Sequence, residues 1–174
     1  MIIGVDPGNT GAIAFLTDEG ELINVVDIPV TKVKVGDKWR SEIDADKVVY
    51  VLEDKFSYGD VVFLERVQAM PRFNMNTGKY DKSQGGAANI AYGRGGGIIE
   101  GVFAAHKVQV YRIPSAEWRP VMVGSKTDKE KSRLTAIKLW PDKADLFKLK
   151  TKHGRAEAAL IGRYGVKHYK MKDE

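Results

Sequence analysis

Residues 1–15 read M-I-I-G-V-D-P-G-N-T-G-A-I-A-F, and this stretch decides how the rest of the chain is interpreted. The run I-I-G-V at 2–5 is apolar and mostly β-branched, which is typical of a buried strand. A turn rich in proline and glycine follows at 7–11, and a second apolar run at 12–16 completes a predicted hairpin. Asp6 therefore ends a core strand beside a turn of small residues. Its carboxylate either bonds the turn amides or belongs to a functional site.

The composition is that of a globular, basic protein. The 174 residues are 43% hydrophobic and 29% charged, so one folded domain is expected over 1–174. Cysteine is absent, which excludes disulfides, thiolate zinc sites and cysteine nucleophiles and fits a reducing cytoplasm. No signal peptide or membrane-length apolar run is visible. A net charge of +5 favours a polyanionic partner.

Strand and helix patterns alternate along the rest of the chain. The hydrophobic periodicity predicts further strands at 21–29, 61–64 and 108–113. It predicts helices at 45–56, 85–106, 127–140 and 153–164, with a short helix after Pro114. The polar segments are expected to be irregular: a basic loop at 31–41, a charged linker at 142–152 and a loose basic tail at 165–174.

The helix predicted at 85–106 contains glycine at positions 93, 95, 96 and 97. Each glycine costs roughly 1 kcal/mol relative to alanine inside a helix. A close approach by another helix or by a nucleic-acid backbone would compensate for that cost. A break of the helix at 93–97 is the other interpretation.

Three acids and one histidine are candidates for a metal site. The run V-V-F-L at 61–64 is typical of a strand buried on both faces, and it also ends on an acid, Glu65. Glu157 lies among alanines in the last predicted helix, one turn after His153. Carboxylates converging at neighbouring strand ends repel one another, and divalent cations relieve that repulsion. Oxygen ligands with one nitrogen suit Mg²⁺, with Mn²⁺ as a substitute.

Basic and aromatic side chains alternate in 66–86, which includes Arg72 and Phe73. A long segment of this kind suits phosphate contacts and base stacking, although a solvated loop packed on the body has the same composition. The helix at 127–140 is also basic, through Lys131 and Arg133 among others. A solvated helix face is the other interpretation of those charges.

Three motifs together resemble a known family. G-V-D-P-G at 4–8, V-F-L-E-R at 62–66 and H-G-R-A-E-A-A-L at 153–160 resemble the active-site series of the RuvC-type Holliday-junction resolvases, and the phage-encoded branch is the closer match. R-I-P-S-A-E-W-R at 112–119 and K-E-K-S-R at 129–133 follow in the expected order, so the resemblance spans nearly the whole chain. It implies a ribonuclease H-like fold, an α/β three-layer fold with a mixed five-stranded sheet flanked by helices.

The same resemblance implies an activity. It describes a cytoplasmic, homodimeric endonuclease of a bacterial cell or phage-infected host that cuts four-way DNA junctions by paired symmetric nicks. The chemistry would be hydrolysis with two Mg²⁺ ions per active site. Asp6, Glu65 and Glu157 match the metal-binding acids of the family, and His153 holds a position where an acid is frequent. Asp145 is the rival for that fourth position.

The resemblance also suggests residues that contact DNA. Arg119 and Lys131 fall where the family has basic residues near the scissile strand. The further candidates are Arg72, Phe73, Arg94 and Arg133. Some family members wedge a phenylalanine into the junction soon after the second acid. Gln68 is near that position here, which leaves Met70, Phe73 or no residue for the role.

Three other functions remain open. The turn D-P-G-N-T-G at 6–11 resembles the first phosphate loop of sugar kinases and Hsp70-like ATPases, but 174 residues leave no room for their second lobe. A nuclease that removes flaps and other branches could use the same acids. A non-catalytic nucleic-acid-binding module of this fold would have little reason to keep them.

Overall fold

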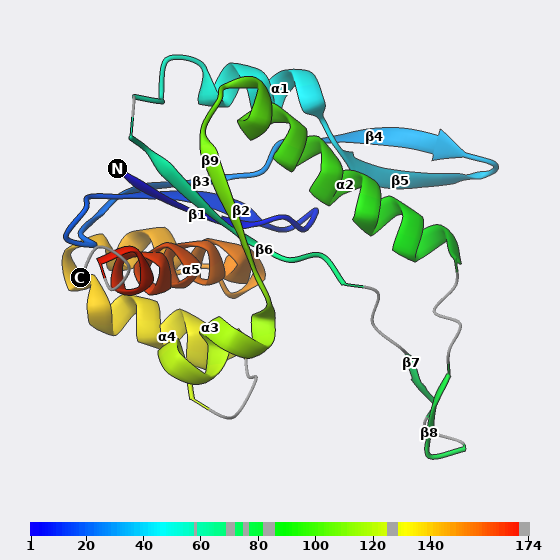
Figure 1. Cartoon of the computed structure of the whole chain (residues 1–174). Coiled ribbons are helices and arrows are strands. Elements are labelled where there is room, and N and C mark those ends of the chain that lie inside the picture. The colour runs from blue at the N-terminus through cyan, green and yellow to red at the C-terminus, as the bar shows by residue number, and fades with distance from the viewer. Residues whose placement is uncertain (58, 69–71, 75–76, 82–85, 125–128, 171–174) are drawn as a thin grey trace.

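The structure is a computed structural model of the chain, and it describes residues 1–57, 59–68, 72–74, 77–81, 86–124 and 129–170 (Figure 1). The strands are β1 (Ile2–Asp6), β2 (Ala12–Leu16), β3 (Leu22–Asp27), β4 (Val30–Val35), β5 (Lys38–Ile43), β6 (Val61–Glu65), β7 (Arg72–Asn74), β8 (Lys79–Asp81) and β9 (Gln109–Ile113). The α-helices are α1 (Ala45–Leu52), α2 (Gly86–Ala105), α3 (Ser115–Met122), α4 (Lys129–Leu139) and α5 (His153–Lys170). Two 3₁₀ helices span Pro141–Phe147 and Lys150–Lys152. None of the described helices has the length and apolar content of a membrane span.

Five strands form one mixed sheet in the order β3-β2-β1-β6-β9. Strand β2 runs antiparallel to β1 and β3, whereas β6 runs parallel to both β1 and β9. The β1–β6 register pairs Val5 with Leu64, so the next residues along the two strands, Asp6 and Glu65, lie side by side. The hairpin and the central strand expected from the sequence are confirmed.

Helices cover both faces of the sheet, so the fold has three layers (Figure 1). On one face α1 and α2 bury a cluster with Ile3, Val5 and Leu64 of the sheet. On the other face α3, α4 and α5 bury a second cluster with Ile2 and Phe63. Because side chains alternate along a strand, the acids that end β1 and β6 belong to the second face, the one that α5 covers.

Helix α5 lies unusually close to β1 because glycines line the contact. A Cβ on Gly4 would lie 2.1 Å from the carbonyl oxygen of Ala158, and a Cβ on Gly162 would lie 2.4 Å from Cδ1 of Leu16. The buried alanines at 156, 158 and 159 continue this small-residue surface. The helix expected from the sequence at 153–164 therefore packs directly on the central strands.

Several boundaries differ from the expectations. Residues 31–41, expected as a loop, belong to the antiparallel ribbon of β4 and β5, and 142–152, expected as a linker, is mostly 3₁₀ helix. Helix α2 is continuous, so the proposed break at 93–97 is wrong. Helix α5 continues through Gly165 to Lys170, where a loose tail was expected, because Gly165 packs against the ring of Phe63.

Candidate metal centre

Two acids lie at the carboxyl ends of β1 and β6. The amide of Gly8 donates to Oδ1 of Asp6 at 3.3 Å, so Asp6 does bond its own turn. The turn itself closes through a hydrogen bond from the Gly11 amide to the Gly8 carbonyl at 2.8 Å. Asp6 can therefore bond its own turn and still belong to a functional site.

The third acid comes from α5, whose first turn contacts the β1–β2 turn. A Cβ on Gly154 would lie 2.3 Å from the Thr10 carbonyl oxygen and 3.0 Å from Oδ2 of Asp6. A side chain larger than hydrogen would push the helix away at this point. Glu157, one turn further along α5, is only 5% exposed. Glycine at 154 therefore brings the third acid to the other two.

Helix α3 supplies hydrogen-bond donors to two of the acids. Nη1 of Arg119 donates to Oε1 of Glu157 at 3.0 Å, and Nε1 of Trp118 donates to Oε2 of Glu65 at 3.3 Å. Nε of Arg119 also donates to Oγ of Ser115 at 2.9 Å. The guanidinium lies 4.5 Å from the centre of the Trp118 ring, so stacking fixes its plane.

The environment of the site perturbs the pKa values of Asp6, Glu65 and Tyr92. Burial, together with the negative charges of Glu157 and Glu65, raises the pKa of Asp6 to about 7. Burial also raises the pKa of Glu65, although the positive charge of Arg119 opposes this rise. Burial and the same three acids raise the pKa of Tyr92, on α2, to about 12. The site thus holds more negative charge than Arg119 neutralises.

Among the described residues, no three His, Asp or Glu side chains are grouped closely enough to hold an ion as they stand. The chemistry of the donor set nevertheless fits a divalent cation. Burial and neighbouring negative charge disfavour the ionised forms of Asp6 and Glu65, and a cation between the carboxylates would reverse that effect. In this structure Arg119 supplies positive charge to Glu157. Asp6, Glu65 and Glu157 are the residues that could hold the metal.

His153 is the first residue of α5 and is partly exposed. It precedes Gly154, where an added Cβ would lie 3.0 Å from Oδ2 of Asp6. Its rival, Asp145, lies in the first 3₁₀ helix, with its side chain 79% exposed and paired with Lys148. The location of His153 keeps it a candidate fourth ligand.

The candidate DNA-contacting residues are dispersed. Arg119 lies inside the acid cluster rather than on the rim, and Arg94 on α2 pairs with Glu42 of β5. Arg133 is mostly buried, where it pairs with Glu130 and donates to the Phe147 carbonyl, so the structure gives it a packing role. Lys131 is exposed on α4.

The remaining candidates cannot be placed in the site. Arg72 and Phe73 belong to β7, but their side chains lie outside what the structure describes. Met70, a candidate wedge residue, lies outside the described residues altogether. Gln68 is described and exposed.

The sequence interpretation missed three residues of this site: Ser115, Trp118 and Tyr92. The spacing of Ser115, Trp118 and Arg119 at i, i+3 and i+4 places all three on one helical face, which was a usable signal. No signal in the sequence pointed to Tyr92, because only the path of α2 past the strand ends brings it near the acids.

Comparisons with known proteins identify the fold. No protein-family model matches the chain, and no curated protein matches its sequence. A search of solved structures finds the RuvC structure of Thermus thermophilus, with a TM-score of 0.58 over 99% of this chain and 97% of that chain. The chain has a ribonuclease H-like fold. At 17% sequence identity this likeness concerns the fold alone.

Proposed function

We propose that this chain is a metal-dependent crossover junction endodeoxyribonuclease that nicks four-way DNA junctions symmetrically in the cytoplasm. The observation that carries the proposal is the electrostatic effect of Glu157 and Glu65 on Asp6, which together with burial raises the pKa of Asp6 to about 7. The RuvC-like fold and the order of the sequence motifs support the choice of a branched DNA substrate. The likeness to the phage-encoded branch is proposed from the sequence motifs alone.

The proposed site would hold two Mg²⁺ ions, for which Mn²⁺ could substitute, through Asp6, Glu65, Glu157 and His153. Such ions activate a water molecule and stabilise the leaving oxygen of a phosphodiester. Trp118 keeps the Glu65 carboxylate oriented by its indole N–H. Arg119 pairs with Glu157 in this structure, and its guanidinium would suit a phosphate oxygen if Glu157 bound a metal instead.

The proposed enzyme is a homodimer that pairs two copies of α2. Glycines 93, 97 and 101 of this helix have no neighbouring atom within 4 Å of an added Cβ, so they form an open stripe along one face. Gly95 and Gly96 instead pack inward, against Ile43 and Val67. Ile90, at the same face, is 72% exposed. Close helix pairing across a two-fold axis would give two active sites for two nicks.

Cleavage of labelled four-way junction, flap and linear duplex, each with Mg²⁺ or with EDTA, tests the proposal. We expect paired nicks in the junction with Mg²⁺ alone and little cutting of linear duplex. Preferential cutting of the flap would indicate a broader debranching nuclease. Binding without cleavage in either Mg²⁺ or Mn²⁺ would indicate a non-catalytic module and contradict the proposal.

A further inference from the structure

Strands β4 and β5 form a two-stranded ribbon that projects from the body of the molecule. Six residue pairs, from Val30–Ile43 at the root to Val35–Lys38 at the tip, make up the ladder. At about 3.3 Å per residue the ribbon is about 17 Å long. Figure 1 shows it extending past α2, away from the five-stranded sheet. The ribbon is a two-stranded sheet of its own, so its strands do not pair with the five-stranded sheet.

The ribbon has a strong excess of unpaired positive charge. Lys32, Lys34, Lys38 and Arg40 are all exposed, and within the described part of the chain none of them forms an ion pair. The acids of the ribbon are Asp37, in the turn, and Glu42, which is already paired with Arg94. Four cations therefore face solvent against one uncompensated carboxylate, an arrangement that suits a polyanion.

An exposed tryptophan lies among these cations. Trp39 is 66% exposed, whereas Trp118 and Trp140 are 0% and 3% exposed. In the ladder Trp39 pairs with Lys34, so the two side chains share one face of the ribbon. An aromatic side chain flanked by cations is the combination that stacks on bases or packs on sugars while the charges bind phosphates.

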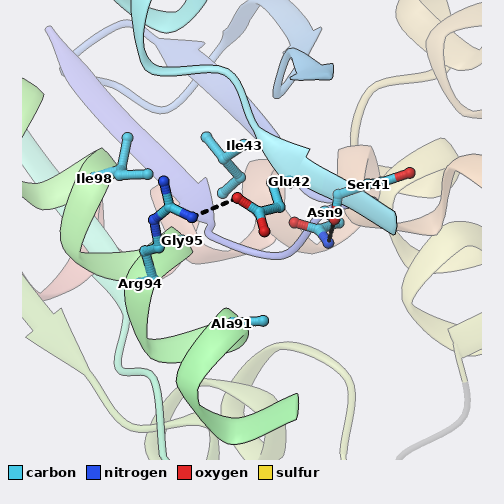
Figure 2. A pocket seen from close by; sticks show the side chains of 8 residues that line it. All are labelled: Asn9, Ser41, Glu42, Ile43, Ala91, Arg94, Gly95 and Ile98. Carbon is cyan, nitrogen blue, oxygen red and sulfur yellow. Dashed lines mark hydrogen bonds and ion pairs between the residues drawn. The ribbon is translucent and has the colours of Figure 1, made fainter. Parts of the chain in front are cut away.

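The root of the ribbon is fixed next to the candidate metal centre. Ile43 is buried in the core cluster of α1 and α2. Nδ2 of Asn9, in the turn after Asp6, donates to the Ser41 carbonyl at 2.8 Å, and Arg94 of α2 pairs with Glu42 (Figure 2). The ribbon is thus joined to the turn that follows Asp6. A molecule bound along the ribbon would lie next to the candidate metal centre.

We propose that the β4–β5 ribbon is a DNA-binding arm that engages a duplex segment next to the scissile phosphate. A two-stranded ribbon fits the major groove of B-form DNA, which is about 12 Å wide. Lys32 and Lys34 share the face of Trp39, and Lys38 and Arg40 lie on the opposite face. The cations therefore contact phosphates on the two sides of the groove, while Trp39 packs against the sugar or base that it meets. The inference rests on the proposed function for the identity of its partner, but the binding can be measured without cleavage.

A charge-matched pair of variants tests the arm. The arm variant combines Lys32→Gln, Lys34→Gln and Lys38→Gln. The control removes equal charge away from the metal site, with Lys55→Gln, Lys107→Gln and Lys167→Gln. These control lysines are exposed, and Lys107 lines a pocket beside the amino end of β6, opposite the acids.

The measurement is the affinity for a four-way junction and for linear duplex in EDTA at several salt concentrations. We expect the arm variant to bind at least about tenfold more weakly. Each phosphate contact contributes about 0.9 to the slope of log affinity against log salt, so that slope should fall by about 2 to 3. The control variant should keep both values within about twofold. Equal losses in the two triple variants would overturn the proposal, because the effect would then be one of net charge.

Trp39 provides a direct reporter, since the other tryptophans are buried. The difference in fluorescence between the wild type and Trp39→Phe isolates its signal. We expect acrylamide to quench Trp39 efficiently in the free protein and much less after duplex DNA is added in EDTA. Unchanged quenching at saturating DNA would overturn the proposal, and so would protection by single-stranded DNA alone.

The two proposals fail separately. Protection of Trp39 by duplex with no cleavage in Mg²⁺ would sustain the arm and contradict the nuclease. Metal-dependent junction cleavage with an unprotected Trp39 would sustain the nuclease and contradict the arm.

Discussion

At the scale of single residues, Asp6 is the acid whose environment disfavours its charge most. Burial and the neighbouring acids raise its pKa from 3.8, the value of an unperturbed aspartate, to about 7, so between these pH values the native state binds the proton that the unfolded chain has released. The free energy of unfolding should therefore fall as pH rises from about 4 to about 7. Above pH 7 the native protein carries the full cost of the ionised carboxylate.

Asp6→Asn removes that cost and should also abolish cleavage. In EDTA at pH 8 we expect the variant to melt at a higher temperature than the wild type, and at pH 5 the difference should shrink. Thermal melts at the two pH values measure this. If the melting temperatures of the two proteins depended on pH in the same way, ionisation of Asp6 would have no cost in stability.

Glu157→Gln should have the opposite effect on stability, because Glu157 is paired with Arg119 in a nearly buried contact. Leaving the guanidinium without that partner should cost about 1 to 3 kcal/mol in EDTA. Asp6→Asn and Glu157→Gln should both lose cleavage and keep junction binding. A gain in melting temperature for Glu157→Gln would mean that Arg119 pairs with Glu65 instead.

His153 and Asp145 are the two candidates for the fourth ligand of the metal site. His153→Ala should require a higher Mg²⁺ concentration for cleavage, whereas His153→Asp should remain active, because a carboxylate is also a Mg²⁺ ligand. Asp145→Ala serves as the control, since its side chain is exposed and paired with Lys148. Cleavage titrated with Mg²⁺ gives the answer. An inactive Asp145→Ala beside a fully active His153→Ala would reverse the assignment.

At the scale of elements, the close approach of α5 to β1 determines whether the acids meet. Gly154→Ala would place a methyl group 2.3 Å from the Thr10 carbonyl oxygen, so the first turn of α5 must move outward. We expect at least about a hundredfold loss of cleavage, since misplacement by about 1 Å carries such a cost. Single-turnover cleavage of the junction measures the effect.

Gly8→Ala is the matched control for this substitution. Its added methyl group would lie 3.6 Å from Oδ1 of the same Asp6, which is an ordinary contact. This variant should cut at close to the wild-type rate. Full activity in Gly154→Ala would show that the position of α5 at its first turn does not matter.

The elements that could be predicted from sequence are those with a clear apolar pattern. The continuous apolar runs at 2–5 and 61–64 indicated central strands, and an acid directly after each run indicated Asp6 and Glu65. The β4–β5 ribbon was missed because its outer residues are exposed on both faces, and the charge of the segment hides the short alternation K-V-K-V at 32–35. The extension of α5 past Gly165 depends on packing against Phe63, which no local pattern records.

The candidate site was predictable in its acids and not in their partners. Glu157 was found because an acid among alanines needs a neighbour, but its pairing with Arg119 joins residues 38 positions apart in the chain. The same holds for Trp118 and Glu65, and for Tyr92 near all three acids. Long-range contacts of this kind depend on how α2 and α3 cross the strand ends.

At the scale of the whole molecule, the open stripe on α2 predicts the assembly. Gly97→Leu should weaken the proposed dimer while leaving the monomer folded, because the added side chain meets open space. Gly96→Leu should instead disturb the fold near the site, since a Cβ there would lie 2.5 Å from Cγ2 of Val67. Sedimentation and thermal melts distinguish the two effects. A wild-type protein that is monomeric at micromolar concentration, and that still nicks both strands in concert, would contradict the dimer.

Metal-dependent hydrolysis at the strand-end acids is tested by single-turnover cleavage of a four-way junction by the wild type and by Glu65→Gln, titrated with Mg²⁺ and compared at equal junction occupancy. We expect no cleavage in EDTA, symmetric nicks that appear with Mg²⁺, and a rate at least about a hundredfold lower for Glu65→Gln. Cleavage by the wild type in EDTA, or equal rates for the two proteins at saturating Mg²⁺, would contradict metal-dependent hydrolysis at this site.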